Sequence, residues 1–210
     1  MQINSVETLF AQSLEQSELS VKQQDVLKAC LTLFSQQGYD RTTTGDIAEL
    51  AGVSEGTVYK HFKNKREILN ALLEPLQASV LPAVADEFTQ EAAAQHFTSL
   101  AEALHFLVSD RLHYVLDNRL VIRVFIQEVM VNPELFDTAY TVVSQRFAPV
   151  VMPMLTRFIG QPADLESFRV VWGLLITYLL PVILKPDLQL DVAATTDKIV
   201  TLALPVLQPR

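Results

Sequence analysis

Three helix-start signals follow one another closely between residues 43 and 66. Thr43, Ser54 and Asn64 are residue types whose side-chain oxygen can accept a hydrogen bond from the first turn of a helix. Asp46 stands three residues after Thr43, where its carboxylate can complete a capping box. Gly52 separates the first two signals and favours a turn. The segment is therefore restricted to two short helices joined by a tight turn, with a third helix after it.

Helices are also expected on both sides of this segment. Leu27, Cys30, Leu31 and Phe34 recur on one helical face, which predicts a helix from Val21 to Gln37 that Gly38 ends. The other expected helices run from Lys65 to a bend or break at Pro75 and over roughly 90–108, 110–131, 134–159, 164–184 and 191–207, with breaks at Pro133, Pro162 and Pro186 and a kink at Pro149 and Pro153. No stretch shows the alternation of a strand. The expected fold class is all-α.

The charge of the chain is distributed unevenly. A formal net charge of -8 disfavours nucleic acid as a partner when it is taken for the whole chain. The stretch from Thr57 to Arg66, however, holds Lys60, Lys63 and Lys65 with His61 and contains no acidic residue. We therefore expect a local basic surface that can meet phosphates.

Two further features bear on the compartment. Cys30 is the only cysteine, which excludes a disulfide framework and fits a reducing cytoplasm, and residues 1–19 form an acidic extension without the pattern of a secretion signal. The apolar run from Val170 to Leu184 would cover only about 22 Å as a helix, short of the ~30 Å hydrocarbon layer. We expect a cytoplasmic, nucleoid-associated protein that spans no membrane, with this run buried in a core or an oligomer interface.

Two short helices around Ala51-Gly52-Val53-Ser54 form the outline of a helix-turn-helix, whose second helix would lie in the major groove. The surrounding residues occur in one register: Gly38-Tyr39, Thr42-Thr43, Ile47-Ala48, Gly56-Thr57-Val58-Tyr59, His61-Phe62 and Asn64-Lys65. Over about residues 21–72 the chain closely resembles the N-terminal domain of the tetracycline-repressor-like (TetR/AcrR-type) family. Thr44, where an aliphatic residue is common, and Gly45, which weakens a helix start, depart from the usual pattern.

Contacts to DNA can be assigned from exposure and chemistry. Thr57 and Lys60 are the main candidates for reading bases, with Gly56 allowing close approach and Glu55 either accepting from a cytosine amine or favouring the helix dipole. The candidates for phosphate contact carry hydroxyl groups or positive charge, or have tips that can reach the backbone as the matching family positions do: Thr43, Ser54, Tyr59, His61, Lys63 and Lys65.

The resemblance also implies roles for the rest of the chain. It divides the chain into an N-terminal extension (1–19), a DNA-binding domain (20–66) and a helical effector-binding and dimerisation domain (67–210). The helices at 164–184 and 191–207 fit a homodimer interface in a four-helix arrangement. Candidates for an apolar effector pocket are polar or aromatic residues inside the apolar helices: His105, His113, Tyr114, Arg123, Gln127, Tyr140, Trp172 and Tyr178. For Trp172 and Tyr178 interface packing is the simpler interpretation.

The sequence thus predicts a DNA-binding transcriptional regulator, a repressor that binds a palindromic operator and is released by a small, largely apolar effector. One alternative is a family member whose C-terminal domain binds a protein instead of a ligand. Another is a helical metal enzyme, because Glu102 and His105, like Asp110 and His113, have the spacing used in di-metal bundles. No second set of inward glutamates, nucleophile triad or phosphate loop accompanies them, so we expect no enzyme activity, metal or cofactor.

Overall fold

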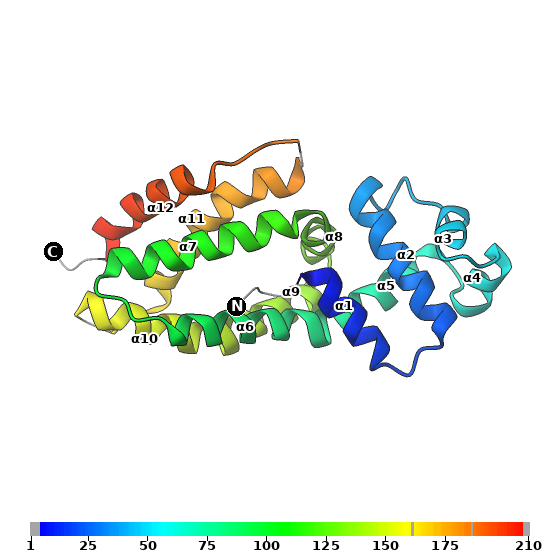
Figure 1. Ribbon diagram of the computed structural model, residues 1–210, viewed down its shortest axis with the longest axis horizontal. Helices are drawn as coiled ribbons and strands as arrows, with labels where there is room; N and C mark the ends of the chain where they lie inside the picture. The colour runs from blue at the N-terminus through cyan, green and yellow to red at the C-terminus, as the bar shows by residue number, and fades with distance from the viewer. Residues whose placement is uncertain (1–4, 161, 186, 208–210) are drawn as a thin grey trace. The chain divides into compact units, whose positions relative to one another are not determined.

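The computed structural model describes residues 5–160, 162–185 and 187–207, and every regular element in these ranges is helical (Figure 1). The described chain falls into two compact units. The head unit comprises Asn4–Val84 and Leu120–Ala139, and the bundle unit comprises Ala85–Arg119 and Tyr140–Arg210. The expected all-α class is confirmed. The functional division at residues 66 and 67 stays a prediction, since the compact units follow different boundaries.

The head unit begins with five helices: α1 (Val6–Glu15), α2 (Val21–Gln37), α3 (Thr44–Leu50), α4 (Glu55–His61) and α5 (Lys65–Pro75). Helix α2 packs on α3 and α5, and α3 packs on α4. Phe34, Ile47, Val58 and Ile68 meet in a core from which solvent is completely excluded. The bounds expected for α2 and α4 match those observed, because both helices begin at a hydroxyl residue and their apolar residues share one face.

Helix α1 belongs to the core of the head unit. Its buried residues Val6, Phe10 and Leu14 repeat every four positions, and the helix contacts α2 and α5. Ser5 caps it by accepting a hydrogen bond from the backbone N–H of Thr8. Most of the segment expected as an acidic extension is therefore a structural part of this unit.

A segment distant in sequence completes the head unit. Most of α8 (Arg119–Val129) and the start of α9 (Pro133–Val142) belong to it. Arg123 Nη2 donates to the carbonyl of Ser35 at the end of α2 over 3.0 Å. Arg66 Nη2 lies 2.9 Å from Glu128 Oε2. These two contacts hold α8 against helices that precede it by more than fifty residues.

The helix after Asn64 differs from expectation. Pro75 is the last residue of α5, and a π-helical turn, η1 (Leu76–Val80), passes the chain to α6 (Leu81–Ala94). The helix therefore continues over Lys65–Ala94, because the π turn accommodates the helical hydrogen bond that is missing at Pro75, which has no backbone N–H. By length and composition this helix could cross a membrane, but 44% of its most apolar window is already buried within the protein, as in a core helix.

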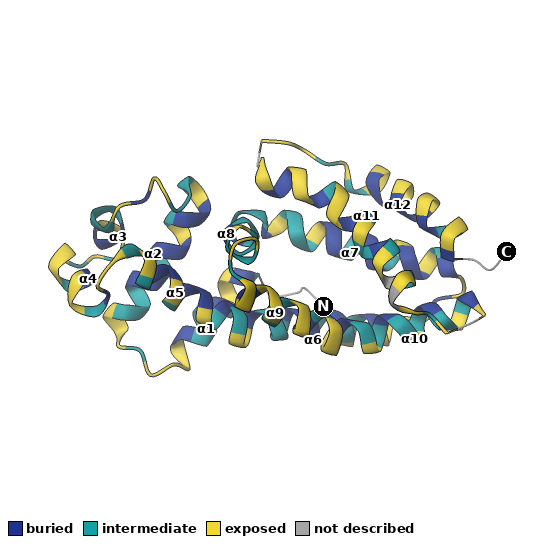
Figure 2. Ribbon diagram, turned by 180° about the vertical axis from the view of Figure 1, so that it is seen from behind, coloured by how far each residue is buried: buried dark blue, intermediate teal, exposed yellow. Residues whose placement is uncertain are grey.

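The bundle unit contains α7 (Leu100–Asp117), η2 (Val143–Phe147), α10 (Ala148–Ile159), α11 (Leu165–Leu184) and α12 (Val192–Leu207). Helix α7 packs on α10, α11 and α12, and α11 also packs on α12. Buried Leu104, Leu175 and Ile199 contribute to this core. Helices α11 and α12 agree with the expected ranges 164–184 and 191–207, and Figure 2 shows buried and exposed residues alternating along both.

The expected helices 90–108 and 110–131 were misplaced. The first break falls between Ala94 and Leu100, where Ser99 caps α7 by accepting from the N–H of Glu102. Glu102 in turn accepts from the N–H of Thr98 at 2.8 Å, which also holds the pKa of its carboxyl below the usual range. The second break is at Asn118. Capping residues, rather than apolar periodicity, determine where these helices begin and end.

Candidate nucleic-acid interface and effector pocket

The start of α3 is fixed by a reciprocal pair of hydrogen bonds. Thr43 Oγ1 accepts from the N–H of Asp46 at 3.1 Å, and Asp46 Oδ2 accepts from the N–H of Thr43 at 2.8 Å. The backbone hydrogen bond from Thr43 is the main reason that the pKa of Asp46 lies below its usual range. Thr43 is exposed, and its hydroxyl can still donate to a phosphate.

The turn between α3 and α4 follows the expected residues. Gly52 has φ of +67°, a left-handed conformation that glycine adopts without strain. Val53 then donates its N–H to the carbonyl of Ala48 at 3.0 Å. Ser54 Oγ accepts from the N–H of Thr57 at 3.1 Å and lies 2.9 Å from Thr57 Oγ1. The hydroxyl groups of Ser54 and Thr57 are thus adjacent at the start of α4.

Helix α4 turns polar side chains to solvent. Val58 is buried in the head unit, while Glu55, Gly56, Tyr59 and Lys60 are exposed. Since the helix has only seven residues, one buried position suffices to orient it. The candidate base-reading residues therefore lie on the open side of the helix, except that Thr57 is half-buried beside Ser54.

Thr44 links both ends of this polar surface. Its hydroxyl donates to Glu55 Oε1 over 2.7 Å and lies 3.0 Å from the hydroxyl of Tyr59. Because Thr44 has a single proton to donate, Tyr59 is the donor in the second bond. Tyr59 must turn that proton away from Thr44 before it can donate to a phosphate. Sequence reasoning noted Thr44 only as a departure from the family pattern.

Lys65, predicted to contact a phosphate, makes several contacts within the head unit. Its ammonium group donates to the carbonyls of Tyr39 at 2.8 Å and Thr42 at 2.9 Å, and lies 4.3 Å from the centre of the Tyr39 ring. These contacts brace the loop before α3. Lys63 is exposed, and its backbone N–H donates to Glu67. His61 is half-buried. The exposed positive charge at α4 and the turn after it therefore comes from Lys60 and Lys63.

The candidate effector residues are divided between the two units. Arg123 and Gln127 lie in the head unit, and Gln127 is exposed. The remaining six belong to the bundle unit, where Tyr140 is 54% exposed, Trp172 and Tyr178 are half-buried, and His113 Nδ1 lies 2.8 Å from the carbonyl of Ser109. His105 Nε2 lies 3.4 Å from Asp197 Oδ1 and borders an open groove of about 470 Å³ with Phe97, Phe106 and Val200.

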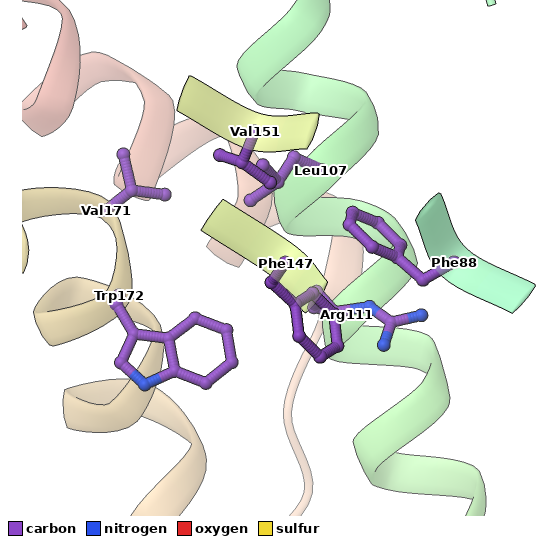
Figure 3. Close-up of a pocket in the computed structure, with 7 residues that line it drawn as sticks. All are labelled: Phe88, Leu107, Arg111, Phe147, Val151, Val171 and Trp172. Carbon is purple, nitrogen blue, oxygen red and sulfur yellow. The ribbon is translucent and has the colours of Figure 1, made fainter. Parts of the chain in front are cut away.

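A small enclosed cavity lies elsewhere in the bundle unit. Figure 3 shows its lining residues, which come from α6, α7, η2, α10 and α11: Phe88, Leu107, Arg111, Phe147, Val151, Val171 and Trp172. Its volume of about 10 Å³ is close to that needed for one water molecule. Trp172 is the one expected effector residue that lines it. Arg111, which sequence reasoning did not select, is the charged member of the wall.

The pairs proposed for a metal are used otherwise. Glu102 caps its own helix start, and the Asp110 carboxylate contacts Arg111. Among the described residues, no group of histidine, cysteine and carboxylate side chains has the arrangement of a metal site.

Comparison with known proteins agrees with the head-unit geometry. The model for "Bacterial regulatory proteins, tetR family" matches residues 26–72. The transcriptional regulator TtgR of Pseudomonas putida is 49% identical over 51 residues, and the fatty acid metabolism regulator of Bacillus subtilis is 28% identical over 85 residues. The matches cover 24% and 40% of this chain and 24% and 44% of those relatives. The chain thus spans less than half the length of these curated relatives. Their names describe regulators, not enzymes.

Solved structures extend the likeness to the fold of most of the chain. A TetR-family regulator from Mesorhizobium loti superposes with a TM-score of 0.65 at 21% identity, covering 88% of this chain and 96% of that one. The regulator FadR of Bacillus subtilis, solved with stearoyl-CoA, gives 0.56 at 16% identity and covers 85% and 96%. The matches identify residues 26–72 as a tetR-family DNA-binding segment, and the solved structures share the helical fold of most of the chain.

Proposed function

We propose that the protein is a dimeric transcriptional regulator that represses from a palindromic operator and is released by a small, largely apolar effector. The observation that carries the proposal is the capped pair α3 and α4, which turns Tyr59, Lys60 and Lys63 to solvent. Residues 20–66 would bind DNA and residues 67–210 would bind the effector and the partner. We expect it in the cytoplasm, associated with the nucleoid and not with a membrane.

Exposure and chemistry of the side chains support the following contacts. Thr57 and Lys60 would read bases, with Gly56 allowing the helix to enter the groove. Glu55 is held by Thr44, which favours a positioning role over base reading. Thr43, Ser54, Tyr59, His61 and Lys63 would meet phosphates, and Lys65 would support them through the loop that it braces.

Dimerisation through α11 and α12 is supported by the side chains that these helices leave exposed. Ile176, Leu180 and Leu184 are 46%, 36% and 48% exposed and lie one turn apart on α11, and Leu202 and Val206 are 52% and 64% exposed on α12. A contiguous apolar stripe of this kind marks a protein interface. Two copies would bring four helices together and pair two reading helices with two half-sites.

The experiment measures fluorescence anisotropy of the labelled upstream region of the protein's own gene, against scrambled DNA of equal length, at several salt concentrations. We expect a preference for the upstream region and an affinity that falls steeply with salt. Tyr59→Ala should weaken binding about tenfold, whereas Tyr140→Ala, which alters an equally exposed tyrosine outside α4, should not. Equal binding of both DNAs, unchanged by Tyr59→Ala, contradicts the proposal.

A second candidate differs in what the bundle unit binds. The cavity of about 10 Å³ is far below the roughly 300–1,000 Å³ of ligand pockets. That observation favours a family member whose bundle unit contacts another protein. Operator binding that persists through a broad screen of apolar compounds, but is abolished by a protein recovered with the full-length chain, would decide for this candidate.

A further inference from the structure

Arg111 is a buried cation in an aromatic environment. The residue is 5% exposed, and its guanidinium carbon lies 4.2 Å from the centre of the Phe88 ring and 5.0 Å from that of Tyr114. Figure 3 shows its side chain among the apolar lining of the cavity, beside Phe147 and Phe88. Withdrawal of a charged group from water is costly unless it is paired and hydrogen-bonded, so the partners of Arg111 decide what this site can bind.

The guanidinium of Arg111 is incompletely hydrogen-bonded within the described part of the chain. It carries five N–H groups. Its Nε donates to Asp110 Oδ2 at 2.6 Å, and Nη2 lies 2.6 Å from the same oxygen. Among the described residues, buried Nη2 has no hydrogen bond of acceptable geometry. One carboxylate oxygen therefore balances the charge of Arg111 but leaves its donors incompletely used.

Tyr114 adds a second unused donor beside Arg111. Its buried hydroxyl has no hydrogen-bond partner in the described part of the chain. Burial raises the pKa of Tyr114 above its usual value, so the phenol keeps its proton at neutral pH and can only gain by meeting an acceptor. Arg111 lines the apolar cavity and its guanidinium carbon lies 5.0 Å from the Tyr114 ring, so two side chains in contact each have a buried donor that an oxygen atom could satisfy.

The charges around this pair favour an uncharged occupant. Asp110 already neutralises Arg111, and Glu87 acts on Tyr114 with a further negative charge. A carboxylate ligand would place an additional anion beside these two acids in a poorly solvated site. A carbonyl oxygen accepts hydrogen bonds without adding charge. Leu107, Val151, Val171 and the ring carbons of Trp172 give the remaining wall an apolar surface.

We propose that the Arg111–Tyr114 pair binds the carbonyl oxygen of an uncharged, largely apolar molecule, whose body lies against Trp172 and Phe147. The inference rests on the proposed effector-responsive function and specifies the chemical class of the effector. Because the cavity is only about 10 Å³, the occupant must separate the lining side chains. Trp172 is half-buried and is therefore the wall member that can move toward solvent.

Trp172 is the only tryptophan of the chain, so its emission reports directly on the site. The experiment titrates the full-length protein with methyl octyl ketone and with decanoate, which have the same number of carbons, and records emission and melting temperature. We expect a saturable emission change and a higher melting temperature with the ketone, and binding by decanoate at least about tenfold weaker.

The variants assign the effect to the donors. Tyr114→Phe should weaken ketone binding about threefold and Arg111→Met about tenfold, whereas Arg157→Met, at an exposed arginine on α10 of the same unit, should leave it unchanged. If Arg111→Met fails to fold because Asp110 loses its partner, Tyr114→Phe still provides the test. Tighter binding of decanoate, or ketone binding unchanged in Tyr114→Phe and any folded Arg111→Met protein, overturns the inference.

Operator binding, measured in the same samples, distinguishes failure of the carbonyl site from failure of the DNA-binding proposal. Tyr59-dependent DNA binding without any response of Trp172 to the ketone overturns the carbonyl site and leaves the DNA-binding proposal intact. A response of Trp172 that needs Tyr114 but does not weaken DNA binding supports the carbonyl site and contradicts release by this class of effector.

Discussion

Helix α4 and the second half of α11 differ in the side chains that they expose. On α4 the exposed residues are polar, and Thr44 ties Glu55 and Tyr59 into a hydrogen-bonded group. On α11 the exposed residues Ile176 and Leu180 are aliphatic. The first surface is stable in water, whereas leaving the second in water costs free energy. We therefore expect binding at α4 to depend on salt concentration, and association through the aliphatic surface of α11 to depend on it little.

The largest expected effect is loss of dimer association through the aliphatic surface of α11. Leu180→Glu places a carboxylate in the α11 stripe, and its burial in a dimer should weaken association by at least about a thousandfold. Sedimentation velocity should show monomers, and operator affinity should fall because two half-sites are no longer held together. Val21→Glu, at a 71% exposed position of α2, is the control. A Leu180→Glu protein that remains a dimer would remove α11 from the interface.

Substitutions of Lys63 and Lys65 distinguish a residue that contacts DNA from one that stabilises the head unit. Lys65→Met should lower the free energy of unfolding by about 1.5 kcal/mol, because the carbonyls of Tyr39 and Thr42 lose their donor. Lys63→Met should change stability by less than about 0.5 kcal/mol. Urea unfolding and the salt dependence of DNA affinity measure both effects. Lys63→Met alone should reduce the salt dependence of DNA affinity, by about one released ion, while the protein stays folded. If Lys65→Met instead reduced this dependence and Lys63→Met lowered stability, the two lysines would have the opposite roles.

A glycine substitution tests whether α4 enters the groove. A Cβ at Gly56 would meet Ser54 Oγ at 3.8 Å, an ordinary contact, so Gly56→Ala should fold and gain about 0.5–1 kcal/mol. Its DNA affinity should nevertheless fall several-fold, because the added methyl group faces the bases. Gly45→Ala on α3, where the nearest contact is Thr43 Oγ1 at 3.6 Å, is the matched control. Equal affinities of Gly56→Ala and the parent protein would place α4 farther from DNA.

The smallest expected effect is acid sensitivity of the α3 cap. The pKa of Asp46 is lowered in the folded protein, so its contribution is fully present above the ordinary aspartate pKa of about 4 and is lost as pH falls through the folded value. Melting temperatures between about pH 3 and 6, followed by circular dichroism, should therefore decline less steeply for Asp46→Asn. Glu102→Gln offers the same comparison on α7. Parallel curves would show that the cap adds no pH-dependent stability.

Local signals explain what could be predicted about the interface. The caps at Thr43, Ser54 and Asn64 each involve a residue three positions later, so the sequence contains both partners side by side. Lys65 finds its acceptors more than twenty residues upstream, and Thr44 finds Tyr59 fifteen residues downstream. Such contacts depend on tertiary packing, which periodicity and capping do not specify.

The pocket shows the same limit more strongly. Phe88, Arg111, Phe147 and Trp172 lie on different elements and meet only through packing of the bundle unit. Selecting polar residues on apolar helices identified Trp172 but favoured exposed residues such as Tyr140. One available signal was missed: Arg111 follows Leu107 by four positions and therefore shares the buried face of α7.

The head unit is assembled from two stretches that are far apart in the gene. Arg123 contacts the end of α2 and Glu128 pairs with Arg66 of α5, so α8 supports the helices next to α3 and α4. A recombination event with one crossover after residue 84 would pair these helices with a foreign α8. Chimeric regulators built from this protein should therefore transfer Leu120–Ala139 together with the N-terminal segment, and natural exchange of operator specificity should proceed by point substitution on α4 more readily than by domain shuffling.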